Sequence, residues 1–218
     1  MRLLSFDVGV RHLAYAVLET ERGEGGVEMK LVGWDLIDLT GGEKLGADEM
    51  AAAIVAALDD AFNDGVTRYD TVLIENQPCM RNPKMKTVQT SIQTYFACLR
   101  HFLPDTVGAV RLVSATRKLL AKGAVPGPVD PTPSDTPPDK AKGAAYRDRK
   151  AAAIRVCGEY LEHVLHDAAA LAKLRASKKK DDLADCFLQA VWFAENPTKA
   201  PPAPKTGPKG SKKKAAPK

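Results

Sequence analysis

The first third of the chain carries short apolar runs separated by polar gaps, a pattern typical of β-strands. Apolar residues dominate segments 2–8 and 13–19, and segment 27–39 alternates loosely between apolar and polar positions. Residues 21–26, rich in Gly and Glu, read as a turn-rich gap. Because strands joined by short connections pair with their sequence neighbours, we expect a three-stranded antiparallel meander.

The middle of the chain switches between helical and strand patterns. Apolar residues recur every four positions from Met50 to Phe62 and predict a helix that stops at residues 63–65. Segment 71–75 (TVLIE) predicts a strand buried on both faces. After a loop at 78–83, the spacing of Val88, Ile92, Phe96 and Leu99 predicts a second helix ended by Pro104, and segment 107–113 predicts a fifth strand.

The remaining part reads as helices around a proline-rich segment. Residues 122–143 hold six prolines and almost no large apolar residue, which predicts a flexible insertion. Helices are expected at 146–166 and 181–195, the second ended by Pro197. Residues 197–218 contain only Lys, Pro, Ala and a few small polar residues, and we expect them to be disordered.

Taken in order, the elements predict an α/β protein with a single mixed sheet. The sheet would be mixed and five-stranded, with three antiparallel strands first, parallel strands later, and helices on both faces. We expect one such domain over residues 1–196, including the insertion, followed by the tail at 197–218.

Composition and charge add a partner to this picture. Of the 32 basic residues, seven are lysines in the tail. The rest of the chain, which we call the body, therefore has 25 basic and 27 acidic residues and is slightly acidic. A basic tail favours a polyanion such as nucleic acid, but is equally consistent with a nuclear-import signal or a solubilising extension. Four scattered cysteines without a CxxC pair argue against zinc and for free thiols. Without an apolar run of about 18 residues or a signal-peptide pattern, we expect a cytosolic or nuclear protein that does not enter a membrane.

Four acidic residues stand where the predicted elements do not require them. Asp7 ends the first strand and Glu75 ends the TVLIE strand, while Asp182 and Asp185 lie three positions apart at the start of the last helix. If the two strands are parallel neighbours, both carboxylates emerge at the carboxyl edge of the sheet, where α/β proteins bind ligands.

Converging carboxylates need a cation to offset their repulsion. Oxygen ligands without His or Cys select Mg²⁺, for which Mn²⁺ can substitute. Two such ions about 4 Å apart are suited to phosphodiester hydrolysis. Each acid also has a structural interpretation: Asp7 and Glu75 can begin turns, and Asp181 and Asp182 can offset the helix dipole. Only the combination of positions favours a metal site.

Three motifs, residues 6–9 with 13–17, 73–77 and 180–185, resemble those of the RuvC-like Holliday junction resolvases of the RNase H-like superfamily. The branch most similar is that of poxviruses and other large DNA viruses, and segment 146–150 (YRDRK) also resembles a basic helix start of that branch. Unlike the bacterial members, the loop after Glu75 carries no aromatic residue, and Arg11-His12 replaces a basic residue followed by Asn.

This resemblance implies an RNase H-like fold and the activity of a crossover junction endonuclease. Such an enzyme would be a homodimer that nicks a four-way DNA junction symmetrically, with two Mg²⁺ ions and no small-molecule cofactor. It implies a role in DNA recombination and repair, or in resolving replicated viral genome concatemers, in the second case inside an infected host cell. The metal ligands carried over are Asp7, Glu75, Asp182 and Asp185, with Asp181 as the alternative to Asp182.

Basic and amide residues near strand ends and helix starts are the candidate DNA contacts. They are Gln77, Lys84, Lys86, Arg117, Lys118, Arg147, Lys150 and Lys180. Any single one can instead be a solvated surface residue, and the Gln77 amide can instead bond its own loop backbone.

Three other functions compete with junction resolution. Another RNase H-like nuclease, acting on branched DNA or on an RNA/DNA hybrid, would carry the same acids. An actin-like ATPase would need a second Asp-x-Gly phosphate loop between strands, and residues 63–65 follow a helix instead. A non-enzymatic binder of branched DNA would not need the four acids.

Overall fold

The computed structural model describes residues 1–78, 82–114 and 138–197, and of residues 138–146 the backbone only. Its sheet contains β1 (Arg2–Asp7), β2 (His12–Gly23), β3 (Gly26–Asp38), β4 (Tyr69–Glu75) and β5 (Val107–Val113) in the order β3-β2-β1-β4-β5. The pairs β1–β2 and β2–β3 are antiparallel, whereas β1–β4 and β4–β5 are parallel. The predicted mixed sheet, with its antiparallel meander first, is therefore confirmed.

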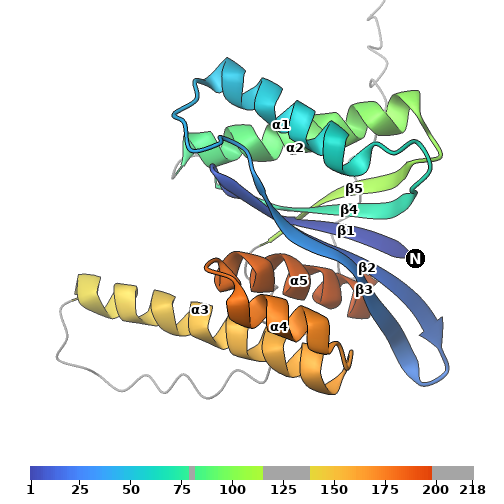
Figure 1. Ribbon diagram of the computed structural model, residues 1–218, viewed down its shortest axis with the longest axis vertical. Coiled ribbons are helices and arrows are strands. Elements are labelled where there is room, and N and C mark those ends of the chain that lie inside the picture. Colours follow the sequence, from blue (N-terminus) through green and yellow to red (C-terminus); the bar gives the residue numbers. More distant parts are fainter. Residues whose placement is uncertain (79–81, 115–137, 198–218) are drawn as a thin grey trace, which may run out of the picture.

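Helices cover both faces of this sheet (Figure 1). Helices α1 (Ala47–Phe62) and α2 (Pro83–Phe102) lie together on one face. On the other face lie α3 (Pro138–His163), α4 (Ala168–Ala176) and α5 (Lys180–Glu195), with α5 directly against the strands. No helix in the described parts of the chain is long and apolar enough to cross a membrane.

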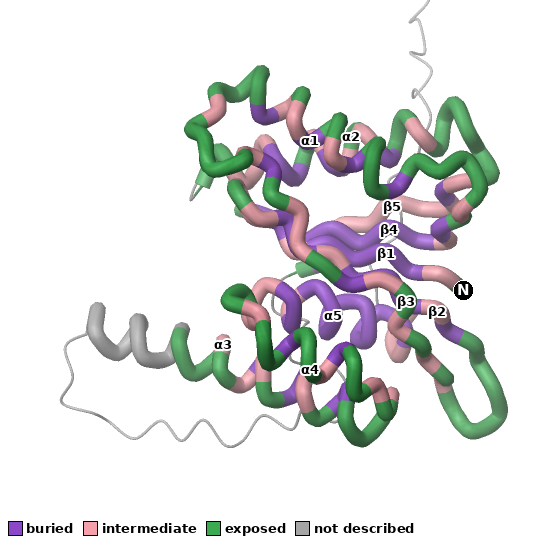
Figure 2. The backbone as a smooth tube through the Cα atoms, viewed as in Figure 1, coloured by how far each residue is buried: buried purple, intermediate pink, exposed green. Residues whose placement is uncertain are grey.

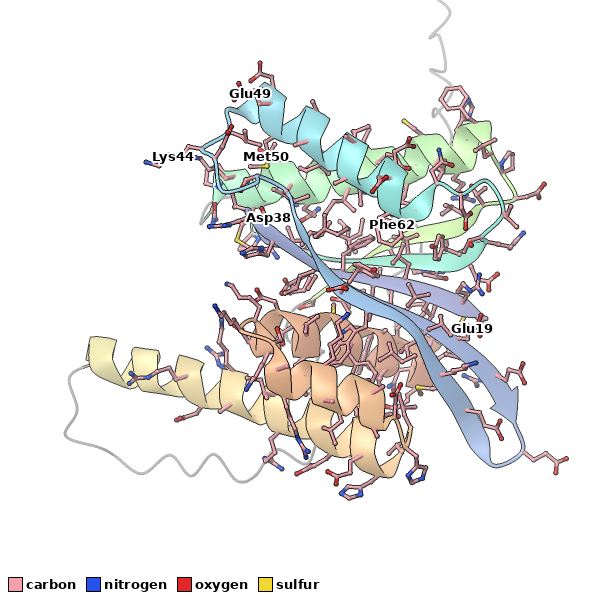
Figure 3. The ribbon with its side chains drawn as sticks, viewed as in Figure 1. Glu19, Asp38, Lys44, Glu49, Met50 and Phe62 are labelled. Atoms are coloured by element: carbon pink, nitrogen blue, oxygen red, sulfur yellow. The ribbon has the colours of Figure 1, made fainter. Side chains whose placement is uncertain are left out.

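Each face of the sheet has its own apolar core. Between the sheet and α1–α2, Phe6, Phe62 and Phe96 stack with ring centroids 5.4–6.2 Å apart. Figure 3 shows Phe62 reaching from the end of α1 toward the strands. Because Val88, Ile92 and Phe96 are fully buried there, the apolar face of α2 belongs to this core and is not a free dimer surface.

The second core surrounds α5. All residues from Leu183 to Ala194 except Asp185 are buried, so the helix is enclosed on nearly all sides, and its tube in Figure 2 is mostly purple. Leu183, Phe187, Val191 and Ala194, which recur at helical spacing, are all buried, and so are most of their neighbours. A helix this deeply buried provides a rigid support for the acids at its start.

Three sequence-based boundaries were wrong. The expected gap at 21–26 is a two-residue turn, because Gly23 pairs with Gly26, whose φ of +131° favours glycine. The proposed insertion at 122–143 overlaps α3, which begins at Pro138, because proline is favourable at the first helical position. Residues 122–137 of that insertion, and the tail from 198, lie outside the described residues.

The helix expected at 146–166 ends at His163, and α4, which the sequence analysis did not predict, follows it. His166 adopts a positive φ of 51°, a conformation that interrupts helical geometry. Asp167 then caps α4, its side chain accepting a 2.9 Å hydrogen bond from the backbone N–H of Ala170. This compact turn folds α4 back so that Leu174 is buried in the core around α5.

Candidate active site

The site begins where two parallel strands end. Asp7 is the last residue of β1 and Glu75 the last of β4. Phe6 pairs with Ile74 in the parallel register, so the following residues, Asp7 and Glu75, occupy neighbouring positions at one edge of the sheet. The turn after Asp7 needs a glycine, because a Cβ on Gly9 would stand 2.2 Å from the carbonyl oxygen of His12. The expectation of two acids at the carboxyl edge of adjacent strands is confirmed at the level of the backbone.

Helix α5 brings the other two acids to the same region. Gln189 is fully buried and donates from Nε2 to the Ser5 hydroxyl (3.0 Å) and the Phe6 carbonyl (3.2 Å), which fastens α5 to β1 just before Asp7. The Trp34 indole N–H donates to the carbonyl of Leu183 (3.0 Å) and fixes the first turn of the helix against β3. These two contacts set the position of the segment that carries Asp182 and Asp185.

The electrostatics show that Asp182 and Asp7 lie close together. Burial raises the pKa of the Asp182 carboxyl, and the negative charges of Asp181 and Asp7 raise it further, against the opposing charges of Lys179 and Lys150. The Lys179 ammonium lies 3.6 Å from Asp182 Oδ2. Residues from opposite ends of the described chain therefore act on one another as like charges.

Asp181 has a different partner. The Lys150 ammonium on α3 donates to its carboxylate. Burial alone would raise the pKa of Asp181, but the hydrogen bond and charge of Lys150 outweigh it, and the pKa lies below its ordinary value. This geometry favours Asp182 over Asp181 as the acid that faces Asp7.

Asp185 is half-buried one helical turn further along α5. Its charge contributes, after burial, to raising the pKa of the Cys157 thiol on α3. Asp185 therefore lies on the side of α5 that meets α3. Cys157 itself is a buried free thiol, as expected for a core cysteine.

Glu75 is held by an amide network. Its side chain is only 9% exposed, and its Oε2 accepts a 2.8 Å hydrogen bond from Nε2 of Gln77. The backbone N–H of Gln77 in turn donates to Oε1 of Gln89 (2.7 Å), a residue of α2 that is 1% exposed. Sequence analysis missed Gln89, although a glutamine between Val88 and Ile92 on an apolar helix face was a detectable signal.

The candidate DNA contacts fall into three groups. Lys84 and Arg147 are exposed, and Lys180 is half-buried where α5 begins. Lys86, Lys150 and Gln77 have protein partners: Lys86 Nζ donates to Gln89 Oε1 (3.0 Å), while Lys150 bonds Asp181 and Gln77 bonds Glu75. Arg117 and Lys118 lie outside the described residues.

The loop after Asp7 carries a further cation at the edge of the site. Arg11 lies 3.5 Å from Asp38 Oδ2, at the end of β3, and is more than half exposed. Figure 3 shows Asp38 beside the loop that leads toward α1. This ion pair lies at the end of the β2–β3 pairing, near the site.

The donor set suits a hard divalent cation, because Asp7, Glu75, Asp182 and Asp185 offer only carboxylate oxygens. In the parts of the chain that the structure describes, however, no three His, Cys, Asp or Glu side chains are grouped closely enough to hold one ion. The backbone thus places the acids side by side, while binding an ion among three of them requires rotation of their side chains.

The whole fold matches that of solved resolvase structures. Thermus thermophilus RuvC superposes with a TM-score of 0.56 at 16% identity, over 93% of this chain and 99% of that one. A fowlpox virus resolvase in complex with Holliday junction DNA gives 0.52 at 17% identity, over 91% and 100%. The yeast mitochondrial Holliday junction resolvase gives 0.55 at 16% identity, over 89% and 78%. The chain therefore has the RuvC-like, RNase H-like fold expected from its motifs.

The sequence is similar to that of a viral protein. No protein-family model matches the chain. An uncharacterized protein of Acanthamoeba polyphaga mimivirus is 29% identical over 130 residues, which is 58% of this chain but only 29% of that protein. The chain thus matches less than a third of the length of this curated relative.

Proposed function

We propose that this protein is a structure-specific endonuclease that resolves four-way DNA junctions by metal-dependent phosphodiester hydrolysis. The observation that carries the proposal is the meeting of Asp7, Glu75 and the start of α5 at one edge of the sheet. The same fold belongs to the Holliday junction resolvases above, one of them solved with its substrate junction.

Asp7, Glu75, Asp182 and Asp185 would hold Mg²⁺, with two ions expected and Mn²⁺ able to replace them. The bound metal supplies an activated water and offsets charge on the leaving oxygen. The chain contributes the arrangement: β1 and β4 fix two carboxylates, and the buried α5 fixes the other two. Lys150 holds Asp181 toward α3, whereas the charge of Asp182 interacts with that of Asp7.

Cations around the site would hold the DNA backbone. Lys84 and Arg147 are exposed, and Lys180 lies next to the acidic pair Asp181–Asp182. Because the body without its tail is slightly acidic, DNA binding depends on these local cations and on the tail. Lys86, Lys150, Arg117 and Lys118 complete the proposed contact set.

Two symmetric cuts in one junction require two copies of the site. The chain carries one set of four acids, so the proposal includes a homodimer that places one set on each of two opposing strands. It places the enzyme in recombination and repair, or in the separation of replicated viral genomes.

Substitution of two carboxylates tests this function. We expect Asp7→Asn and Glu75→Gln to abolish Mg²⁺-dependent cleavage of a labelled four-way junction while leaving its dissociation constant largely unchanged. The reason is that each change removes a metal ligand but no contact with the DNA backbone. Exposed Asp48→Asn on α1 is the matched control and should cleave normally.

The substrate panel includes three-way, flap and linear DNA and an RNA/DNA hybrid. Paired symmetric nicks in the four-way junction support resolution, and preferential cleavage of the hybrid would show another RNase H-like nuclease instead. Tight junction binding with no cleavage under any metal would leave a non-enzymatic DNA-binding protein. Undiminished nicking by either Asp7→Asn or Glu75→Gln would contradict the proposed mechanism.

A further inference from the structure

A chain of hydrogen bonds connects Glu75 to the interior of α2. Gln77 Nε2 donates to Glu75 Oε2 at 2.8 Å, and the Gln77 backbone N–H donates to Gln89 Oε1 at 2.7 Å. Gln77 and Gln89 are 8% and 1% exposed. We call Gln77 and Gln89 together the amide relay. This hydrogen-bonded chain starts in the core and ends on a carboxylate at a strand end. A loop amide that bonded only its own backbone would not make that connection.

Both amides have only one workable orientation. The Gln89 oxygen receives two donors, the Gln77 N–H and the Lys86 ammonium at 3.0 Å, so its oxygen must face them. Gln77 faces a carboxylate, which accepts but does not donate, so its NH₂ group must face Glu75. Because neither amide can be reversed without losing a bond, the relay defines one position for Glu75 Oε2.

We propose that Gln77 and Gln89 are positioning residues for Glu75, which fix the plane of its carboxylate for binding a divalent cation. This inference rests on the proposed function. It also assigns Gln77 a role different from a DNA contact. Groups that orient a metal-binding carboxylate typically contribute 10- to 100-fold to metal affinity or activity.

The relay acts through the backbone as well as the side chains. Gln89 is held in the helix that packs on β5 and α1, so its oxygen is a fixed point within the core. By accepting from the Gln77 N–H, it sets the course of the chain as it leaves β4, two residues after Glu75. The Lys86 ammonium reaches the same oxygen and also Asn76 Oδ1 at 3.5 Å, which further restrains this segment.

Four variants of the full-length chain test the relay. Gln89→Leu removes the acceptor at nearly constant size, whereas Gln89→Glu keeps an oxygen toward both donors. Gln77→Met removes the donor to Glu75. Gln93→Leu is the matched control, because Gln93 is one turn further along α2 and half-buried beside a surface hollow. Thermal unfolding verifies that each variant is folded before it is used.

The primary measurement is Mn²⁺ binding to the DNA-free protein, by calorimetry or by the paramagnetic signal of free Mn²⁺. We expect the dissociation constant to rise about 10- to 100-fold in Gln89→Leu and Gln77→Met. Gln89→Glu should recover most of the wild-type affinity, and Gln93→Leu should match the wild type. A merely structural role would lower the unfolding temperature without this pattern of rescue.

Two further measurements separate the alternatives. The junction dissociation constant, measured without a cleaving metal, should be the same for Gln77→Met and wild type. An increase there with unchanged Mn²⁺ affinity would make Gln77 a DNA contact and overturn the relay. Unchanged Mn²⁺ binding in Gln89→Leu and Gln77→Met, or no Mn²⁺ binding by the wild type, would also overturn it. Absence of junction cleavage by the wild type contradicts the proposed function, whereas the Mn²⁺ measurements decide the relay independently.

Discussion

At the scale of single residues, the site places neighbouring acids in opposite electrostatic conditions. Asp182 is crowded by burial and by the charges of Asp181 and Asp7, and its pKa is raised. Asp181, its neighbour in sequence, has a lowered pKa because Lys150 outweighs the effect of burial. Asp182 therefore costs stability when ionised, whereas Asp181 contributes stability when ionised.

Asp182→Asn and Asp181→Asn should therefore change the unfolding temperature in opposite directions. The pKa of Asp182 is raised in the folded protein. Ionised Asp182 therefore begins to destabilise the fold as the pH rises above 3.8, the ordinary pKa of an aspartate, and does so fully above the raised pKa. Asp182→Asn should therefore raise the unfolding temperature of the metal-free protein at pH 7, with the gain vanishing as the pH falls to 3.8. Asp181→Asn should lower it at pH 7, and that loss should shrink as the pH falls below 3.8 through the lowered pKa.

Calorimetric scans between pH 7 and pH 3 measure both effects, and junction cleavage distinguishes the roles. We expect Asp182→Asn to lose cleavage and Asp181→Asn to retain it. A stabilised Asp181→Asn, or a cleaving Asp182→Asn, would exchange the assignment of the two residues.

At the scale of elements, α5 combines a structural and a functional task. Its first turn carries Asp181 and Asp182, Asp185 lies one turn further along, and the rest of the helix is core. Phe187 is fully buried, with ring centroids 5.9 Å from both Trp34 and Tyr160. Trp34 also binds the first turn through Leu183, so the packing around Phe187 and the position of Asp182 are connected.

Truncation of Phe187 should be costly. Phe187→Ala leaves a cavity in a close-packed core, and we expect a loss of about 3–5 kcal/mol in the free energy of unfolding. Phe102→Ala is the control, because Phe102 at the end of α2 is 75% exposed and the change should stay within about 0.5 kcal/mol. Urea titration followed by circular dichroism measures both. Equal losses in the two variants would show that α5 is not packed as described.

Most elements of the fold follow from periodicity, and the exceptions have physical reasons. The strand Val107–Val113 and the helix ending at Phe62 match their predicted limits because apolar spacing and stop residues agree there. Helix α4 was not predicted from the sequence because its nine residues are mostly Ala, Lys and Arg, with little apolar periodicity.

The site was partly predictable for a similar reason. Asp7 and Glu75 could be placed because strand ends are visible in sequence, and their adjacency needed only one parallel pairing. The separation of Asp181 from Asp182 depends on Lys150, 31 positions earlier, and Gln89 depends on the turn of α2 that faces Gln77. Such long-range partners leave no local pattern in the chain.

At the scale of the whole molecule, charge is divided between body and tail. Residues 197–218 hold seven lysines and no acid, while the rest has 25 basic and 27 acidic residues. In the proposed function, the long-range attraction to DNA would therefore come mainly from the tail, and the chemistry from the folded part.

Removal of residues 197–218 should weaken junction binding without stopping cleavage. Each tail lysine that contacts a phosphate contributes about 0.9 to the slope of log affinity against log salt, so the shortened chain should show a shallower slope. Binding titrations at several salt concentrations give the slope, and cleavage at saturating DNA gives the rate. A shortened chain with the same slope, or with no metal-dependent activity, would contradict this division.

The parallel pairing of β1 with β4, and the hydrogen bonds from Gln189 that fasten α5 to β1, have a consequence during synthesis of the chain. The proposed metal ligands are spread from Asp7 to Asp185, which lies in the last helix that the structure describes. A chain still leaving the ribosome, or one ended by an early stop codon, carries Asp7 and Glu75 without Asp182 and Asp185. Copies that end before α5 would therefore be unable to cut DNA, and a cell that makes the proposed nuclease would meet its activity only once α5 is complete.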